Sequence, residues 1–163
     1  MSKNSLISEV ELDLQQAFTR LTSFRENRFH PLVWVNGEPV IGEGTFIGAF
    51  SEVNAKGCDV FIGPHCDIAS FVSINCADSH QRCLGLSEEI ERKSIRIGHH
   101  VFIGSHCLVK GGATIGDYCV IAAGTMVDGV EIPPYSLVSG NPMVVRAGYY
   151  REKLLQAGVL GSL

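Results

Sequence analysis

Three side chains suited to proton transfer and charge recognition alternate within one short segment, "NCADSHQRCLGLSEEIERKSIR", residues 75–96. They are Asp78, His80 and Arg82. A neutral histidine accepts a proton near pH 7, because its unperturbed pKa is about 6.5. All three stand close to Ile74, where a strand is expected to end, so a rigid scaffold can position them. The charges further along the segment are expected to form a solvated face: Glu88, Glu89, Glu91, Arg92 and Lys93.

This segment interrupts a repeat with a period of six residues. An aliphatic residue returns at every sixth position, and a small or β-branched residue stands four positions after it. A period of six fits neither a helix nor a long strand. It predicts short strands, one per hexad, that turn a corner each time and close a triangular coil every three hexads. The aliphatic series comprises Ile41, Ile47, Val53, Ile62, Ile68, Ile74, Ile97, Ile103, Val109, Ile115, Ile121 and Val127, and, after a slip of one residue, Ile132, Val138 and Val144.

The small or β-branched positions are expected to point inward beside the aliphatic residues. They comprise Thr45, Ser51, Gly57, Cys66, Val72, Val101, Cys107, Ala113, Cys119 and Thr125. Three of the six cysteines fall in this series, so Cys66, Cys107 and Cys119 are expected to fill the core. The cysteines show no C-x-x-C spacing, and no metal site is expected.

The 163 residues are enough for one domain with a sizeable core. The repeat predicts a β-helix over residues 40–146, with the excursion 75–96 projecting from one corner. An amphipathic helix is expected over about residues 9–22 within the N-terminal region, residues 1–39, and a second helix within 147–163. Both flanks are expected to cover an open end of the solenoid, because a bare terminal coil is an unpaired sheet edge.

Charge and hydropathy patterns restrict the class of function. The net charge is −4 with both signs interspersed, which argues against a nucleic-acid partner. The first thirty residues lack the apolar core of a signal peptide, and no stretch approaches the roughly 20 apolar residues of a membrane span. A soluble, cytoplasmic protein is therefore expected.

Two stretches of the repeat carry a resemblance to a known family. "IGHHVFIGSHCLVKGGATIGDYCVIAAGTMV" and "IPPYSLVSGNPMVVR" resemble the left-handed β-helix acyltransferases with hexapeptide repeats. The branch that they resemble contains galactoside, maltose and xenobiotic acetyltransferases and the sugar O-acetyltransferases of polysaccharide synthesis. The resemblance covers about residues 40–146 and implies an all-β fold, a left-handed parallel β-helix. We also expect a homotrimer, because one helix face cannot enclose a coenzyme whereas the excursion of one subunit can cover its neighbour's coils.

The resemblance also implies a reaction, the direct transfer of an acetyl group from acetyl-CoA to a hydroxyl or amino group of a sugar or sugar nucleotide. The family's catalytic histidine aligns within one residue of His80, although part of the family has it earlier, at the position of Ala77 here. His80 would be the general base, with Asp78 or a main-chain carbonyl fixing its tautomer. The amide of Ser105 would stabilise the oxyanion of the thioester. The candidate substrate-binding residues are Asn75, Asp78, Arg82 and Phe102, the last at a position where the family often has Trp.

The same resemblance places the coenzyme along a groove between two subunits. Ala122 would offer its main-chain groups, and Arg146 suits a phosphate because its guanidinium donates two parallel hydrogen bonds. A structural salt bridge is the alternative role for Arg146. The full set of candidate coenzyme-binding residues is Gly104, Ser105, Ala122, Thr125, Asn141, Pro142 and Arg146.

Three other interpretations fit parts of the sequence. A γ-type carbonic anhydrase has the same fold with three histidines around zinc, but its ligand positions are occupied here by Ser105 and Lys110. His99, His100 and His106 instead fall at expected corners. A non-catalytic interaction module would use the β-helix as a rigid surface. A covalent mechanism would use one of the two cysteines of the excursion, Cys76 and Cys83, as an acylated nucleophile.

Overall fold

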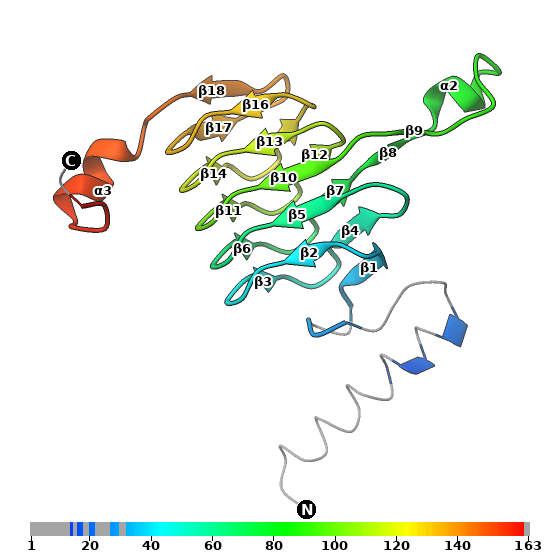
Figure 1. The fold of residues 1–163 in the computed structure, drawn as a ribbon, viewed down its shortest axis with the longest axis horizontal. Helices are drawn as coiled ribbons and strands as arrows, with labels where there is room; N and C mark the ends of the chain where they lie inside the picture. The colour runs from blue at the N-terminus through cyan, green and yellow to red at the C-terminus, as the bar shows by residue number, and fades with distance from the viewer. Residues whose placement is uncertain (1–13, 15, 18–19, 22–26, 30–31, 162–163) are drawn as a thin grey trace, which may run out of the picture.

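A computed structural model describes residues 14, 16–17, 20–21, 27–29 and 32–161. Short strands, each followed by a corner, build a solenoid of stacked coils (Figure 1). Strands of successive coils pair in parallel and form three sheets, here named A, B and C.

Each sheet takes one strand from each of several coils. Sheet A contains β1 (Trp34–Gly37), β4 (Glu52–Ala55), β7 (Ser73–Asn75), β12 (Leu108–Lys110) and β15 (Met126–Val127). Sheet B contains β2 (Val40–Ile41), β5 (Val60–Ile62), β10 (Ile95–Ile97), β13 (Thr114–Ile115) and β16 (Glu131–Ile132). Sheet C contains β3 (Phe46–Ile47), β6 (Asp67–Ile68), β11 (Phe102–Ile103), β14 (Val120–Ile121), β17 (Leu137–Ser139) and β18 (Val144–Arg146).

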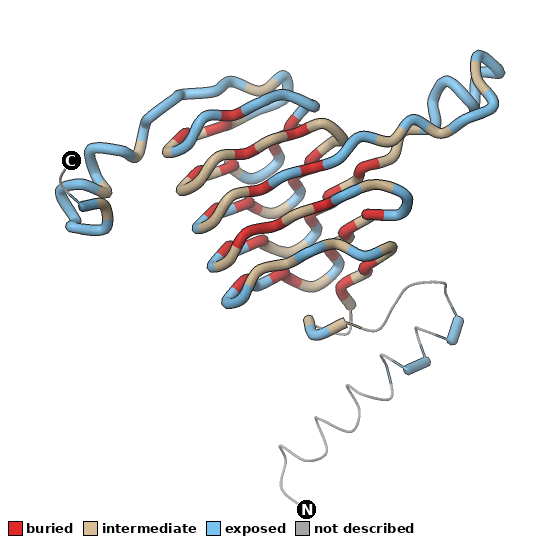
Figure 2. The backbone as a smooth tube through the Cα atoms, viewed as in Figure 1, coloured by how far each residue is buried: buried red, intermediate tan, exposed pale blue. Residues whose placement is uncertain are grey.

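Aliphatic residues of the hexads stack in register on the inner side of each sheet. In sheet B, Ile62 pairs with Ile97, and Ile97 with Ile115. All three side chains are buried, as are their equivalents in the other sheets (Figure 2). Burial of one such side chain contributes about 1.5–3 kcal/mol, so this repeated stack is the main stabilising feature. The expected parallel β-helix of hexapeptide repeats is confirmed.

The cysteines of the small-residue series lie in the core as expected. Cys66, Cys107 and Cys119 are buried. Their thiols donate to carbonyl oxygens of Gly98, Ala122 and Pro133 at 3.1, 3.1 and 3.2 Å. Burial raises the pKa of all three thiols, so they stay protonated and unreactive. The placement of Gly57 in this inward series is wrong: Gly57 is exposed at a corner with φ +79°, a conformation that favours glycine.

Two corners of the solenoid carry rows of neighbouring rings on residues with positive φ, all stacked except the tilted pair of His65 and His100. One ladder consists of Phe50, Phe71 and His106, with ring centroids 5.2 and 4.9 Å apart. The other consists of His65, His100, Tyr118 and Tyr135, with neighbouring centroids 5.0, 4.9 and 5.9 Å apart. Coils repeat at about the strand spacing of 4.8 Å, so equivalent corner rings meet at stacking distance. A stacked pair contributes about 0.5–1.5 kcal/mol, which offsets part of the strain of a positive φ.

The two ends of the solenoid differ from expectation. The first coil begins at Trp34, before the expected boundary at residue 40. At the other end β18 turns back and pairs antiparallel with β17, so Val144 is 59% exposed and its assignment to the inward series is wrong. Gly140, at φ +92°, precedes this reversal and supplies the conformation that it requires.

The expected helix at the C-terminal end does not cover the solenoid within this chain. The C-terminal helix α3 (Arg151–Gln156) lies within the expected range but has no buried residue, so its expected covering role is wrong within this chain. It extends beyond the coils in Figure 1. Residues 14, 16–17 and 20–21 are helical, and the rest of the helix expected over 9–22 lies outside the described residues. No helix within the described ranges is both long and apolar enough to cross a membrane.

Replacement of Thr45 by valine tests the contribution of the buried hydroxyl groups to the core. Thr45 Oγ1 donates to the Gly63 carbonyl at 2.8 Å and accepts from the Cys66 amide at 3.0 Å. Thr45→Val removes both bonds without changing the side-chain shape, and should lower the free energy of unfolding by about 1–3 kcal/mol. Denaturant unfolding should show this loss, whereas Thr114→Val, on the half-buried outer side of β13, should be nearly neutral. Equal midpoints for the two variants would contradict the assigned role.

Candidate active site

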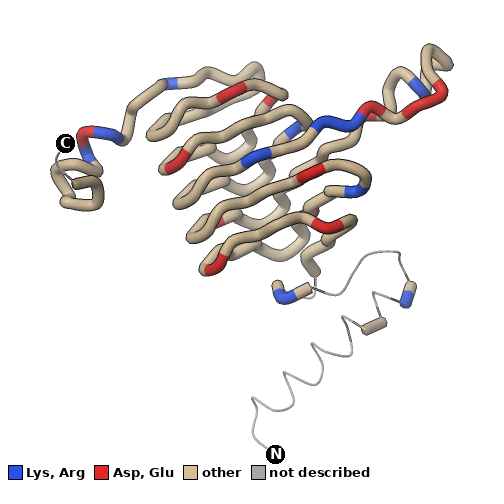
Figure 3. The backbone as a smooth tube through the Cα atoms, in the orientation of Figure 1, with Lys and Arg blue, Asp and Glu red and all other residues tan. Residues whose placement is uncertain are grey.

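The break in the repeat forms a projecting ribbon with a helical turn. After β7 the chain leaves sheet A as β8 (Ala77–Asp78), which pairs antiparallel with β9 (Glu91–Arg92). The short helix α2 (His80–Cys83) starts just beyond β8. The ribbon projects from the corner between sheets A and B (Figure 1), and residues of both charge signs lie along it (Figure 3). The expected projection from one corner is confirmed.

The root of the ribbon is fixed to the solenoid on its returning side. The Lys93 amide donates to the Cys76 carbonyl at 3.0 Å, and Nη1 of Arg92 donates to the Lys56 carbonyl one coil away. A Cβ on Gly57 would lie 3.1 Å from Cδ of Arg92, so glycine there gives the arginine its space. The expectation that Arg92 belongs to a solvated face is therefore wrong. Arg92 and Lys56 are 36 residues apart in the sequence, and most of the excursion lies between them. The sequence therefore contained no signal for this contact.

His80 contacts Asp78, which is one of the two partners that the sequence left open for its ring. Nδ1 of His80 lies 2.7 Å from Oδ1 of Asp78, and the same oxygen accepts the His80 amide at 3.0 Å. These two bonds, the amide first, lower the pKa of Asp78, so its carboxylate stays ionised at neutral pH. With Nδ1 held by a carboxylate, the neutral ring carries its proton on Nδ1 and has Nε2 as the acceptor. This tautomer is the one that a general base needs.

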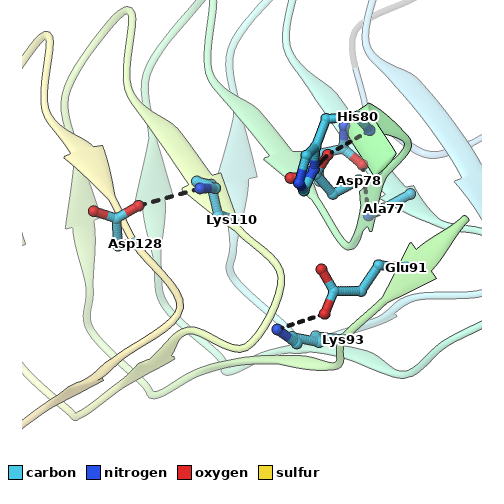
Figure 4. A network of polar contacts seen from close by, with 8 residues as sticks. Ala77, Asp78, His80, Glu91, Lys93, Lys110 and Asp128 are labelled. Carbon is cyan, nitrogen blue, oxygen red and sulfur yellow. Dashed lines mark hydrogen bonds and ion pairs between the residues drawn. The ribbon is translucent and has the colours of Figure 1, made fainter. Parts of the chain in front are cut away.

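A hollow of about 320 Å³ lies at the root of the ribbon, next to Asp78. Its polar lining comes from Asn75, Asp78, Glu91, Lys93 and Lys110. Figure 4 shows one space with ion pairs on two sides of it, surrounded by the side chains of Asp78, His80, Glu91, Lys93 and Lys110. The Lys93 ammonium lies 2.8 Å from Glu91 Oε1, and the Lys110 ammonium 3.3 Å from Asp128 Oδ1. From the sequence, Asn75 and Asp78 were expected to bind substrate, and both line the hollow. Glu91 and Lys93 were expected to belong to a solvated face, but they also line it. Sequence reasoning gave Lys110 and Asp128 no role at the site.

Asn75 belongs to a row of polar residues at one edge of sheet A. It lies in register with Asn54 on one side and Lys110 on the other. Asn75 Oδ1 accepts from Asn54 Nδ2 at 3.1 Å and from the Ala77 amide at 3.0 Å. Both bonds occupy the oxygen of Asn75, so the side chain faces the hollow as a donor through Nδ2.

The two remaining candidates for substrate binding are placed away from the hollow. Arg82 is exposed on α2 and does not line the hollow. Phe102 is 41% exposed on β11, in sheet C, which is a different face of the solenoid from the ribbon's corner. One copy of the chain therefore does not bring Phe102 to His80.

The expected coenzyme residues of the regular coils are largely engaged in coil stacking. The Ala122 amide donates to the Val138 carbonyl at 2.9 Å, and the Ala122 carbonyl accepts the hydroxyl of buried Thr125 at 2.6 Å. A Cβ on Gly104 would lie 2.5 Å from the Ala123 amide nitrogen, which is a packing reason for glycine. Ser105 lies at the corner between sheets C and A. Its carbonyl accepts the Gly124 amide at 2.9 Å, and its own amide donates no hydrogen bond within the described part of the chain.

The remaining coenzyme candidates lie on the reversed C-terminal segment. Asn141 and Pro142, joined by a cis peptide bond, are exposed in the turn before β18. Arg146 pairs with Leu137 at the end of β18 and is exposed. Among the described residues no carboxylate forms an ion pair with Arg146, so the structural salt bridge has no partner there.

The structure does not favour either alternative chemistry, the covalent cysteine mechanism or the zinc site with three histidines. Cys76 is buried, and Cys83 is exposed on α2, with no base contacting either thiol in the region of the chain that the structure covers. His99 and His100 have Nδ1 atoms 3.0 Å apart at one corner, whereas His106 stacks on Phe71 at another. The three histidines of the zinc alternative therefore do not converge. No group of three or more potential metal-binding side chains occurs within the described ranges.

Comparison with known proteins supports the assignment of the hexapeptide repeat. Residues 94–129 match the family model described as bacterial transferase hexapeptide (six repeats). The matched residues lie within the six-residue repeat that forms the stacked coils. The chain is 45% identical over 60 residues to the galactoside O-acetyltransferase of Escherichia coli K12 and 47% identical over 51 residues to a putative acetyltransferase of Staphylococcus aureus strain COL. These segments are 36% and 31% of this chain, and only 29% and 25% of the respective relatives.

Solved structures share the architecture. The polySia-specific acetyltransferase NeuO superposes with a TM-score of 0.59 and 30% identity over 67% of this chain and 51% of its own. A maltose O-acetyltransferase from Clostridium difficile 630 superposes with a TM-score of 0.53 and 24% identity over 84% and 85% of the two chains. AntD, an N-acyltransferase from Bacillus cereus solved with dTDP and 3-hydroxybutyryl-CoA, reaches a TM-score of 0.67 at 16% identity, over 81% and 74% of the chains. The last two show likeness of fold alone.

Replacement of Arg92 tests whether it anchors the ribbon. A hydrogen bond from a charged donor contributes about 1.5–3 kcal/mol, so Arg92→Ala should loosen β8 and β9 against the solenoid. Amide hydrogen exchange of residues 77–93 should become about tenfold faster or more, since 1.4 kcal/mol corresponds to a factor of ten. Arg96→Ala is the matched control, because Arg96 lies next to the ribbon but stacks over Phe61. Unchanged exchange in Arg92→Ala would show that the ribbon is held by its backbone pairing alone.

Proposed function

We propose that the protein transfers an acetyl group from acetyl-CoA to a sugar hydroxyl, with His80 as the general base. The observation that carries this proposal is the 2.7 Å contact between His80 Nδ1 and Asp78, which leaves Nε2 as the proton acceptor beside a polar hollow. The similarity of the repeat to a galactoside O-acetyltransferase supports the type of reaction. NeuO, at 30% identity, supports a carbohydrate acceptor.

The proton and electron balance of the transfer is simple. The acceptor oxygen attacks the thioester carbonyl while its proton moves to Nε2 of His80, and a tetrahedral oxyanion forms. Collapse of this intermediate breaks the C–S bond. The imidazolium returns the proton to the departing sulfur, so the products are the acetyl ester and free coenzyme A. Asp78 stabilises the imidazolium while it exists, because its carboxylate stays ionised and bonded to the ring.

The oxyanion requires a rigid donor, and the amide of Ser105 remains the candidate. It donates to no other group in the described chain, and its corner is held by the hydrogen bond between Ser105 and Gly124. Ser105 lies at the corner between sheets C and A, whereas the ribbon leaves the corner between sheets A and B. His80 and Ser105 of one copy therefore cannot act on the same thioester. The proposal requires Ser105, with Phe102 and Arg146, to come from a neighbouring copy.

Substitution of His80 tests the proposed base. His80→Ala should lower kcat of thiol release from acetyl-CoA by about 10²–10⁴, because no other group accepts the hydroxyl proton. His80→Gln keeps a hydrogen-bonding side chain but cannot take the proton, and should be nearly as inactive. His65→Ala, which removes an exposed imidazole at the corner between sheets B and C, should remain within a few-fold of the parent. If both His80 variants retain kcat within a few-fold, the base lies elsewhere.

The oligomeric state tests the shared site. We expect a homotrimer, in which each ribbon covers the coils of the next copy. The exposed helix α3 fits this assembly, because isolated helices shorter than about 12 residues are marginal in water and this one buries no residue in its own chain. Light scattering coupled to size-exclusion chromatography should give three times the chain mass. A fully active monomer would contradict both the trimer and the sharing of residues between copies.

A further inference from the structure

Three histidines gather at the corner between sheets B and C, away from the hollow and its ribbon. Nδ1 of His99 lies 3.0 Å from Nδ1 of His100. The ring centroid of His65, one coil earlier, lies 5.0 Å from that of His100. The ribbon leaves a different corner, the one between sheets A and B. The reaction proposed for His80 therefore gives these three imidazoles no task.

The ring of His99 is held by the carboxylate of Asp117, which lies one coil further on. Oδ2 of Asp117 lies 3.1 Å from Nε2 of His99, and Oδ1 accepts the His99 amide at 2.9 Å. A Cβ on Gly98 would collide with this Oδ1, so glycine there leaves room for the carboxylate. In its neutral form the His99 ring therefore donates through Nε2 and presents the lone pair of Nδ1.

This arrangement is typical of metal-binding histidines. Such a histidine almost always donates its second ring N–H to a carboxylate, a carbonyl oxygen or water, which fixes the ring and raises its basicity. Without a cation, Nδ1 of His100 donates its proton to Nδ1 of His99. The other tautomer of His100 carries the proton on Nε2 and presents a second lone pair beside the first. The hydrogen-bonded pair and a chelating pair therefore differ by one tautomer.

The distance between the two Nδ1 atoms favours one class of cation. An imidazole nitrogen lies about 2.0–2.1 Å from a bound Zn²⁺, and ions of similar size have similar distances. Two nitrogens 3.0 Å apart then subtend an angle of about 94° at the ion. This angle fits adjacent positions of a square-planar or tetragonal complex of Cu²⁺ or Ni²⁺ better than the tetrahedral geometry of Zn²⁺. Histidine χ2 is broad, so a small rotation of each ring aims both lone pairs at the ion.

The surroundings of the two rings are suited to a cation. The turns that stack at this corner comprise residues 42–45, 63–66, 98–101, 116–119 and 133–136. These turns contain two carboxylates, of Glu43 and Asp117, and no lysine or arginine. The side chain of His99 is 39% exposed and His100 is exposed, so an ion can reach both rings and keep water at its other positions.

We propose that His99 and His100 form a binding site for a divalent transition-metal cation of the Cu²⁺ and Ni²⁺ class, completed by water. Asp117 does not bind the metal and acts by orienting His99. His65 contributes no ligand, since the described residues contain no group of three or more metal-binding side chains. The site is separate from the hollow, so it stands or fails independently of the acyl transfer proposed for His80.

Calorimetric titration of the full chain with NiCl₂ tests the two ligands. Ni²⁺ is a better probe than Cu²⁺, because Cu²⁺ oxidises thiols and Cys83 is exposed. His99→Ala and His100→Ala should each weaken Ni²⁺ binding by about tenfold or more, since loss even of a partner that orients a ligand costs about 10–100-fold. His65→Ala and His80→Ala, which each remove another exposed imidazole, should leave the affinity within a few-fold. Unchanged affinity in both test variants would overturn the site.

The orienting role of Asp117 has its own test. In Asp117→Asn the amide oxygen still accepts the His99 amide, but the charge that favours a proton on Nε2 is lost. Ni²⁺ affinity should fall by about 10–100-fold. Glu43→Gln is the matched control, because it removes the other carboxylate of the same row of turns. Equal losses in the two variants would reduce the effect to general attraction of a cation and would overturn the role of Asp117.

Comparison of metals and thermal unfolding complete the test. Ni²⁺ should bind more tightly than Zn²⁺, and equal or tighter binding of Zn²⁺ would overturn the tetragonal geometry. Saturating NiCl₂ should raise the Tm of the parent, because a cation that binds the folded state stabilises it by mass action. The Tm of His99→Ala should not respond. An equal rise in both proteins would place the ion elsewhere and overturn the proposal.

Discussion

Stacking of the coils in register is the constraint on which the rest of the molecule depends. Ile62, Ile97 and Ile115 can lie one above another only because every coil returns to the same three directions. Because the coils are regular, the side chains that alternate with the buried ones along each strand point straight outward from flat sheets. Outward neighbours in one sheet run parallel at about 4.8 Å and do not converge on a common point. A solenoid of this kind is stable, but its regular part cannot surround a reacting atom.

The ribbon at residues 77–92 solves this geometric problem by leaving the repeat at one corner. Its pairing of Ala77 with Arg92 makes a short ladder, which alone would be marginally stable. The contact of Arg92 with the Lys56 carbonyl and the space above Gly57 tie that ladder to the coil below. His80 is therefore positioned through a chain of contacts that begins in the packed coils and ends at the carboxylate of Asp78. A substitution far from the hollow can act on the imidazole through this chain.

The parts of the structure that sequence reasoning predicted are those governed by period and by local spacing. The stacks of Ile and Val, the buried cysteines and the contact of His80 with Asp78 follow from positions along the chain. The contact of Arg92 with Lys56 and the ring contacts of His65 with His100 and of Phe71 with His106 span the excursion, so a count in sixes cannot give them. The ion pair of Lys110 with Asp128 joins residues one coil of 18 apart, so the period allowed it to be predicted, although it was not. The reversal at β18 was missed because Val144 keeps the period while Gly140 turns the chain away.

Asp78 connects the proposed base, His80, to the charged groups of the hollow. Its carboxylate fixes the imidazole of His80 by a bond of 2.7 Å and also faces the two lysines of the hollow. Loss of its charge would release the ring from the tautomer that the proposed base requires. Glu91 and Asp128 carry no such double role, because their side-chain ion pairs are with Lys93 and Lys110. Substitution at Glu91 or Asp128 would therefore change the charge of this region while the contact of His80 with Asp78 stays intact.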